Sequence, residues 1–186
     1  LMGTGQLGIN RFLLVTFLFI VMLCGCSKSD VASDTTFSIS HPAVAYSPRG
    51  YEPGSSELSR KQIIEDLQLL KNLGFRSLVT YGAQGVLSSI PEIARNEGFD
   101  GTIIMGIWNP QSQEEITNAL KQARFVNGYC VGNEGLGVRY SPDTLTSVMV
   151  SLRRITNHPV TTSERIDSYL YGPYQDWLLK NSDWLF

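Results

Sequence analysis

The chain has 186 residues, a formal net charge of -2, 17% charged residues and 42% hydrophobic residues. This composition is that of an ordinary globular domain and excludes a disordered chain, which would carry more charge and fewer apolar residues. Lys and Arg total 15 against 17 Asp and Glu, so the chain has no cationic excess, and we expect no nucleic-acid partner. Two His and three Cys offer little material for a metal site, and we expect neither a metal nor a cofactor.

The N-terminal segment predicts a lipoprotein signal peptide over residues 1–25. Arg11 precedes an uncharged apolar run over residues 12–23. A helix of this length spans roughly 18 Å, which is short for a membrane core of roughly 30 Å and fits the apolar region of a signal peptide. Leu23-Cys24-Gly25-Cys26 resembles a bacterial lipobox, which implies cleavage after Gly25 and acylation of Cys26. The alternative is a plain secretory signal with incidental cysteines.

Residues 26–42 predict a flexible tether, because they are rich in Ser, Asp and Thr and have no apolar period. An acylated Cys26 would attach the tether to a membrane of the cell envelope. Removal of Cys24 and acylation of Cys26 would leave Cys130 without a partner, so we expect no disulfide.

From Ala43 onward, the sequence alternates short apolar strands with amphipathic helices. Gly74 and Gly98 end the first two helices, and Ser112 and Glu115 have the spacing of a capping box at the start of the third. We expect Arg153 and Arg154 to lie on a solvated helix face. The predicted strands are residues 43–46, 76–81, 102–108, 128–133 and 159–163, with the start of a sixth at 184–186. The predicted helices are residues 56–73, 86–97, 112–125, 141–155 and 174–180.

This alternation predicts a parallel sheet with right-handed crossovers, either a doubly wound open sheet or a closed barrel. No Gly-rich phosphate loop follows the first strand, and polar and aromatic residues stand at the C-terminal ends of several strands, which favours the barrel. We therefore expect an α/β fold of the (β/α)8 TIM-barrel type, with about strands one to six in residues 43–186. Because a barrel of this type has roughly 250 residues, we expect the chain to be C-terminally truncated.

Asn133 and Glu134 follow the fourth strand and are candidates for chemistry. A carboxylate flanked by Gly132 and Gly135 can be approached closely by a substrate and suits a general acid. An Asn side chain both donates and accepts hydrogen bonds, as recognition of a sugar hydroxyl requires. Equally, Glu134 can cap the following loop while Asn133 turns a corner.

Aromatic residues at other strand ends favour a carbohydrate site over simple core packing. Tyr46, Tyr81 and Trp108 end three separate strands, and the C–H faces of sugars stack on such rings. Glu164 follows the fifth strand and is a further candidate. Arg49 has two interpretations, contact with sugar hydroxyls or a salt bridge to Glu52 or another carboxylate at the rim.

Val131-Gly132-Asn133-Glu134 resembles the strand-four motif of glycoside hydrolase family 17, the β-1,3-glucanase family, whose wider clan of (β/α)8 barrels carries Asn-Glu at this position. The similarity extends from about Ala43 to the last residue and is nearest to bacterial, envelope-associated members. Further stretches that carry it are residues 46–54, 78–82, 104–108 and 162–164.

The resemblance implies a retaining mechanism with two carboxylates about 5 Å apart. It implies that Glu134 is the acid/base and that Asn133 binds the sugar 2-hydroxyl. The family's nucleophile ends the seventh strand, to which no residue here corresponds, so Glu164 is interpreted as a binding or supporting residue, together with Tyr46, Tyr81 and Trp108.

The sequence thus predicts a lipid-anchored hydrolase of β-1,3-glucan, with a glucan oligosaccharide or polysaccharide as partner, on the periplasmic or extracellular side of a bacterial membrane. The alternatives are a transglycosylase of the same glucan and a non-catalytic glucan-binding lipoprotein. We expect these 186 residues alone to be inactive.

Overall fold

The computed structural model describes residues 37–39, 41–52 and 58–185. The predicted signal peptide, Cys26 and most of the predicted tether lie outside the described residues. The fold is α/β, with one parallel sheet of five strands that lie side by side in chain order. The strands are β1 (Ala43–Tyr46), β2 (Ser77–Thr80), β3 (Ile103–Ile107), β4 (Gly128–Asn133) and β5 (Val160–Ser163). These bounds confirm the five predicted strands to within one residue at each end.

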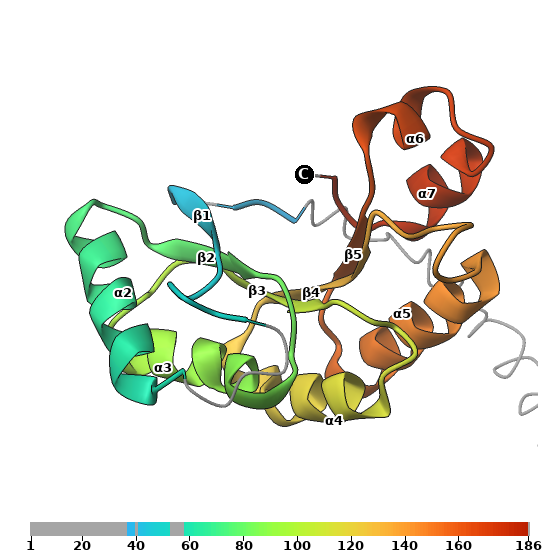
Figure 1. The fold of residues 1–186 in the computed structure, drawn as a ribbon. Helices are drawn as coiled ribbons and strands as arrows, with labels where there is room; N and C mark the ends of the chain where they lie inside the picture. Colours follow the sequence, from blue (N-terminus) through green and yellow to red (C-terminus); the bar gives the residue numbers. More distant parts are fainter. Residues whose placement is uncertain (1–36, 40, 53–57, 186) are drawn as a thin grey trace, which may run out of the picture. The chain divides into compact units, whose positions relative to one another are not determined.

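The connecting helices cover one face of the sheet. Figure 1 shows α2, α3, α4 and α5 together below the strands. Parallel strands are generally joined by right-handed crossovers, and in a sheet whose strands follow chain order such crossovers carry every helix to the same face. The connecting elements are α2 (Arg60–Asn72), η1 (Gly85–Ser89), α3 (Ile90–Asn96), α4 (Gln113–Lys121), η2 (Ala123–Phe125) and α5 (Pro142–Thr156).

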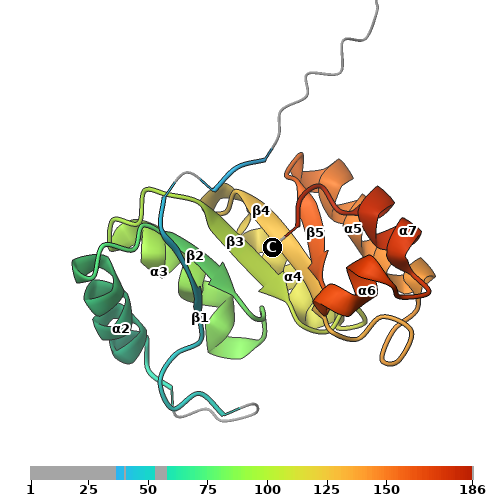
Figure 2. The same cartoon turned by 90° about the horizontal axis from the view of Figure 1, so that it is seen from above.

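Side-chain alternation divides the sheet into two faces of different character. The face toward the helices contributes the large buried residues of the main core, among them Leu78, Met105 and Tyr129. The opposite face, which Figure 2 views with α3 and α4 behind the strands, has smaller groups in its centre. There Gly106, Cys130 and Thr161 lie in register on three adjacent strands.

Three predicted helices need correction. The first begins at Arg60, not residue 56, because Ser59 caps it by accepting a hydrogen bond from the Gln62 N–H. The second is divided into η1 and α3, and Pro91 lies in the first turn of α3, where its missing N–H is tolerated. The third ends at Lys121 and is followed by η2. The predicted ends at Gly74 and Gly98 are confirmed, since both glycines have the positive φ of a residue that follows a helix.

The chain after β5 differs from the prediction. A short helix, α6 (Ile166–Leu170), was not predicted, whereas α7 (Gln175–Asn181) was. Trp184 and Leu185 do not form the expected sixth strand, and Phe186 lies outside the described residues. The segment nevertheless runs along β5, because the Asp183 N–H donates to the Val160 carbonyl oxygen at 3.2 Å.

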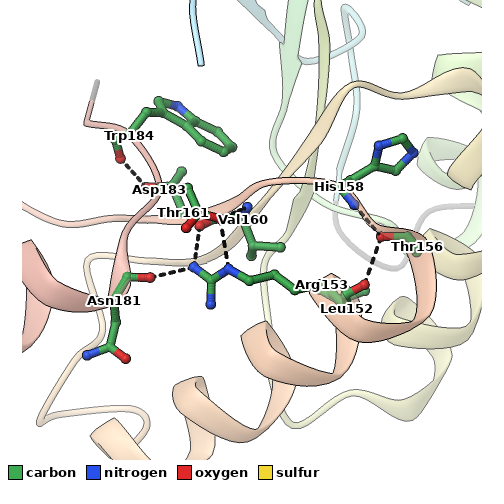
Figure 3. Close-up of polar contacts among 9 residues, drawn as sticks. All are labelled: Leu152, Arg153, Thr156, His158, Val160, Thr161, Asn181, Asp183 and Trp184. Carbon is green, nitrogen blue, oxygen red and sulfur yellow. Dashed lines mark hydrogen bonds and ion pairs between the residues drawn. The ribbon is translucent and has the colours of Figure 1, made fainter. Parts of the chain in front are cut away.

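Arg153 holds this last segment in place and is not the solvated residue that we expected. Figure 3 shows its side chain reaching from α5 between β5 and the chain beyond α7. Its Nε lies 2.7 Å from the Asp183 carboxylate, and its Nη2 donates to the carbonyl oxygens of Val160 at 2.8 Å and Asn181 at 2.5 Å. The Asp183 carboxylate also accepts from the Val160 N–H at 2.6 Å. The Arg153 and Asp183 side chains thus satisfy both the N–H and the carbonyl oxygen of Val160, the first residue of β5.

Candidate functional site

An aromatic pocket of about 400 Å³ lies at the C-terminal ends of the first three strands. It brings together two residues predicted from the sequence, Tyr81 after β2 and Trp108 after β3, and adds Tyr51 from the loop after β1. Tyr81 and Trp108 are 48% and 42% exposed, so both residues are accessible to a ligand. The full lining of the aromatic pocket is Ser47, Tyr51, Tyr81, Gly82, Gln84, Leu87, Trp108 and Glu115.

Tyr46, the third predicted aromatic residue, does not line this pocket. It is 6% exposed and belongs to the core, where its hydroxyl donates to the Asp66 carboxylate of α2 at 3.2 Å. Burial and the neighbouring Asp66 charge both raise the pKa of Tyr46. Asp66 also accepts from the backbone N–H and Nε of Arg49, so the partner of Arg49 is a buried carboxylate on α2 and not Glu52.

Glu115 has a role in the pocket that the sequence did not reveal. Half of the predicted capping box is present, since the Ser112 hydroxyl accepts from the Glu115 N–H at 3.3 Å. The Glu115 carboxylate, however, accepts from the backbone N–H groups of Ala83 at 3.0 Å, Trp108 at 2.8 Å and Asn109 at 3.2 Å. Capping-box spacing does not determine the direction of the Glu side chain, which here reaches the ends of β2 and β3. Burial and the Glu115 charge raise the pKa of Tyr51.

Asn133 and Glu134 lie at the C-terminal end of β4, as predicted. Asn133 is the last residue of the strand, and the Glu134 N–H donates to the Ser163 carbonyl oxygen of β5 at 2.8 Å. Glu134 has a φ of 49° and an exposed side chain. Residues other than glycine rarely adopt this left-handed conformation, and such strained positions gather at functional sites.

Glu164 supports the β4–α5 loop, which we define as residues 134–141. One oxygen of its carboxylate accepts from the N–H groups of Gly135 at 3.1 Å and Leu136 at 3.0 Å, and from the Tyr140 hydroxyl at 3.3 Å. Burial and the Glu164 charge raise the pKa of Tyr140. In the described chain, Glu164 therefore positions the loop that carries Glu134.

Arg139 connects this loop to the aromatic pocket. Its guanidinium carbon lies 5.1 Å from the centre of the Trp108 ring and 5.4 Å from that of Tyr140, distances typical of cation–π contacts. The same group donates to the Asn133 carbonyl oxygen. Nothing in the sequence around Arg139 indicates this contact, because it depends on how the loop folds back toward β3.

Cys130 lies in β4, the strand before the β4–α5 loop, and is a buried cysteine that forms no disulfide among the described residues. Burial, with a smaller contribution from the Glu164 charge, raises the pKa of its thiol to about 12. A neutral thiol is a poor nucleophile at physiological pH. Within the described ranges, no three His, Cys, Asp or Glu residues are grouped in a way that could hold a metal ion.

No protein-family model matches the chain, and no curated protein sequence matches it. Among residues 37–39, 41–52 and 58–185, no helix has the length and hydrophobicity needed to cross a membrane. A functional proposal for the chain therefore rests on its sequence motifs and on the geometry of the strand ends.

Proposed function

We propose that the chain belongs to a retaining glycoside hydrolase that acts on β-1,3-glucan in the bacterial cell envelope. The observation that carries the proposal is the juxtaposition, along one edge of a parallel sheet, of Asn133-Glu134 and a pocket walled by Tyr51, Tyr81 and Trp108. A carboxylic acid at the same edge of the sheet as exposed aromatic faces suits the binding and protonation of a sugar chain. The proposal also includes acylation of Cys26 as the membrane anchor.

We further propose that the five strands are the first strands of a (β/α)8 barrel. Their order follows the chain without reversal, whereas a doubly wound sheet reverses order at a switch point. All the crossover helices lie on one face, as on the outside of a barrel. The Asp183 N–H donates to the Val160 carbonyl oxygen at the edge of β5, where a sixth strand would begin. In such a barrel, the catalytic groups stand at the C-terminal ends of the strands.

In the proposed mechanism, Glu134 protonates the glycosidic oxygen as the bond to the anomeric carbon breaks, and a second carboxylate forms the glycosyl-enzyme intermediate. Glu134 then removes a proton from the water that attacks this intermediate. Asn133 binds the sugar 2-hydroxyl, while Tyr81 and Trp108 stack on neighbouring sugar rings. Glu164 supports Glu134 through the β4–α5 loop, and Tyr46 packs in the core at the end of β1.

The test is Glu134→Gln in the full-length protein, assayed for release of reducing sugar from laminarin. We expect a loss of turnover of about 100-fold or more, because general acid catalysis of this kind contributes that much. The control is Glu65→Gln on α2, an exposed carboxylate that lies 3.7 Å from the Lys61 ammonium, which should keep normal turnover. Unchanged hydrolysis by Glu134→Gln would contradict the assignment.

The same assay separates the two alternative functions. A transglycosylase with this site would form products longer than the substrate, because a sugar hydroxyl replaces water at the glycosyl-enzyme intermediate. A non-catalytic glucan-binding protein would bind laminarin with no change in chain length. Chromatography of the product mixture distinguishes the three outcomes.

A further inference from the structure

We propose that Glu115 is a positioning residue that sets the shape of the aromatic pocket for ligand binding. The inference rests on the proposed function only for the identity of the ligand, a β-1,3-linked glucan. Its structural basis is the way the Glu115 carboxylate joins the ends of two neighbouring strands.

The Glu115 carboxylate fixes both walls of the pocket at once. One oxygen accepts from Ala83 N–H at 3.0 Å and Trp108 N–H at 2.8 Å, and the other accepts from Asn109 N–H at 3.2 Å. Ala83 follows the strand that presents Tyr81, and Trp108 directly follows β3. The backbone beside both exposed rings is therefore tied to a single side chain.

Burial makes these hydrogen bonds strong. Glu115 is only 4% exposed although it lines the pocket, so its charge has little water to solvate it. Hydrogen bonds to an ionised acceptor in such surroundings are stronger than neutral ones, and an unsatisfied buried donor is costly. Replacement of the carboxylate would leave at least one backbone N–H without an acceptor, and the strand ends would have to move to satisfy it.

The start of α4 does not need Glu115 as a cap. Ser112 accepts from the Glu115 N–H through its hydroxyl, and the Ser112 N–H is already satisfied by the Asn109 carbonyl oxygen at 2.9 Å. The carboxylate therefore accepts hydrogen bonds from the backbone of the pocket instead of from the helix start. Asn118, one turn further along α4, supports the same loop by donating to the Ala83 carbonyl oxygen at 3.0 Å.

The experiment compares three variants of the full-length protein. Glu115→Gln keeps the shape of the side chain but offers one acceptor oxygen and turns an NH₂ group toward backbone donors. Ser112→Ala removes the helix cap and leaves the carboxylate in place. Glu114→Gln is the matched control, because this neighbouring carboxylate makes one exposed hydrogen bond of 3.3 Å to the Gly85 N–H.

We expect Glu115→Gln to bind a β-1,3-linked glucose hexamer roughly tenfold more weakly by titration calorimetry, the size of effect expected from the loss of one charge-assisted hydrogen bond. Turnover at saturating glucan should change less than affinity. Ser112→Ala should lower the melting temperature and keep normal affinity, and Glu114→Gln should resemble the wild type in both.

When the wild type binds glucan, two results would overturn the proposal. One is normal affinity in Glu115→Gln, and the other is an equal loss of affinity in Ser112→Ala, which would indicate general destabilisation. If the wild type does not bind glucan at all, the proposed function fails and amide hydrogen exchange decides the role of Glu115. Faster exchange at Ala83 and Trp108 in Glu115→Gln alone would support positioning of a pocket for another ligand. Unchanged protection at both amides would refute it.

Discussion

The aromatic pocket and the β4–α5 loop stand at the same edge of the sheet, and each is held by one carboxylate. Glu115 fixes the pocket from a helix behind it, and Glu164 fixes the loop from the neighbouring strand. In the pocket, the backbone N–H groups that donate to Glu115 lie next to Tyr81 and Trp108 in the chain. At the start of the loop, Glu134 and the preceding strand residue Gly132 have positive φ values, and Gly132 and Gly135 lie against the Tyr140 side chain.

Under the proposed function, this difference corresponds to separate regions for binding and for chemistry. Rings that stack on a sugar need a stable surface, which short and well-bonded strand ends provide. A proton-transferring group, the role proposed for Glu134, must instead be held at one point, and the loop holds Glu134 in a strained backbone conformation supported by Glu164. The comparison predicts that the loop is the more fragile of the two regions, and substitutions and pH changes at the loop can test this.

The largest effect is expected at Gly132, which has a φ of +80°. A Cβ at this position would lie 2.5 Å from the Tyr140 hydroxyl, so Gly132→Ala adds a steric clash to backbone strain. We expect a loss of about 3 kcal/mol in the free energy of unfolding, measured by urea denaturation. Gly74→Ala is the control, since Gly74 has a φ of +93° but a Cβ there would meet no atom within 4 Å, and it should lose only about 1 kcal/mol. Equal losses in the two variants would show that packing around Tyr140 is not the source of the fragility.

An intermediate effect on stability is expected at high pH, through Cys130 in β4, the strand that leads into the loop. Its folded pKa of about 12 lies above the ordinary value of 9.0, so the folded state retains a proton that the unfolded chain releases. The stability from this proton is complete below pH 9 and is lost as the pH rises toward the folded pKa. Between pH 7 and pH 10 we expect the free energy of unfolding to fall by about 1 kcal/mol from this group. Cys130→Ala should remove that part of the fall, and an unchanged slope in this variant would assign it to other groups.

The smallest effect on the free energy of unfolding is expected at Glu134 itself. Asn tolerates a left-handed conformation better than Glu, so Glu134→Asn should raise the free energy of unfolding by about 0.5 kcal/mol while it abolishes turnover. Asn157, with a φ of 57° at the end of α5, is the reverse control. Asn157→Glu should lose a similar amount in thermal or urea unfolding. A destabilised Glu134→Asn would mean that contacts of the Glu134 side chain outweigh its backbone strain.

The strands were predictable because each is a short apolar run between turn residues. The elements that failed depend on contacts between distant residues. Residues 184–185 look like a strand in sequence, but Asp183 and Arg153 satisfy the start of β5 with side chains. The five-residue helix α6 is too short to show an apolar period, and Pro91 divides a helix that periodicity alone had joined.

The candidate site was predictable where position along a strand determines position in space. Tyr81 and Trp108 follow adjacent strands and share a pocket for that reason. Tyr46 ends a strand as well, but its side chain points to the helix side and meets Asp66. The roles of Glu115 and Arg139 depend on side-chain direction and on the path of a loop, and neither is encoded in residue spacing.

The ring contact between Phe37 and Trp184, with centroids 4.4 Å apart, determines where the described chain enters the fold. Trp184 also approaches Gly128, the first residue of β4, so Phe37 lies near the N-terminal ends of the strands. The aromatic pocket and Glu134 lie at the opposite, C-terminal ends. The described chain therefore enters the fold at the ends of the strands that lie opposite the aromatic pocket and Glu134.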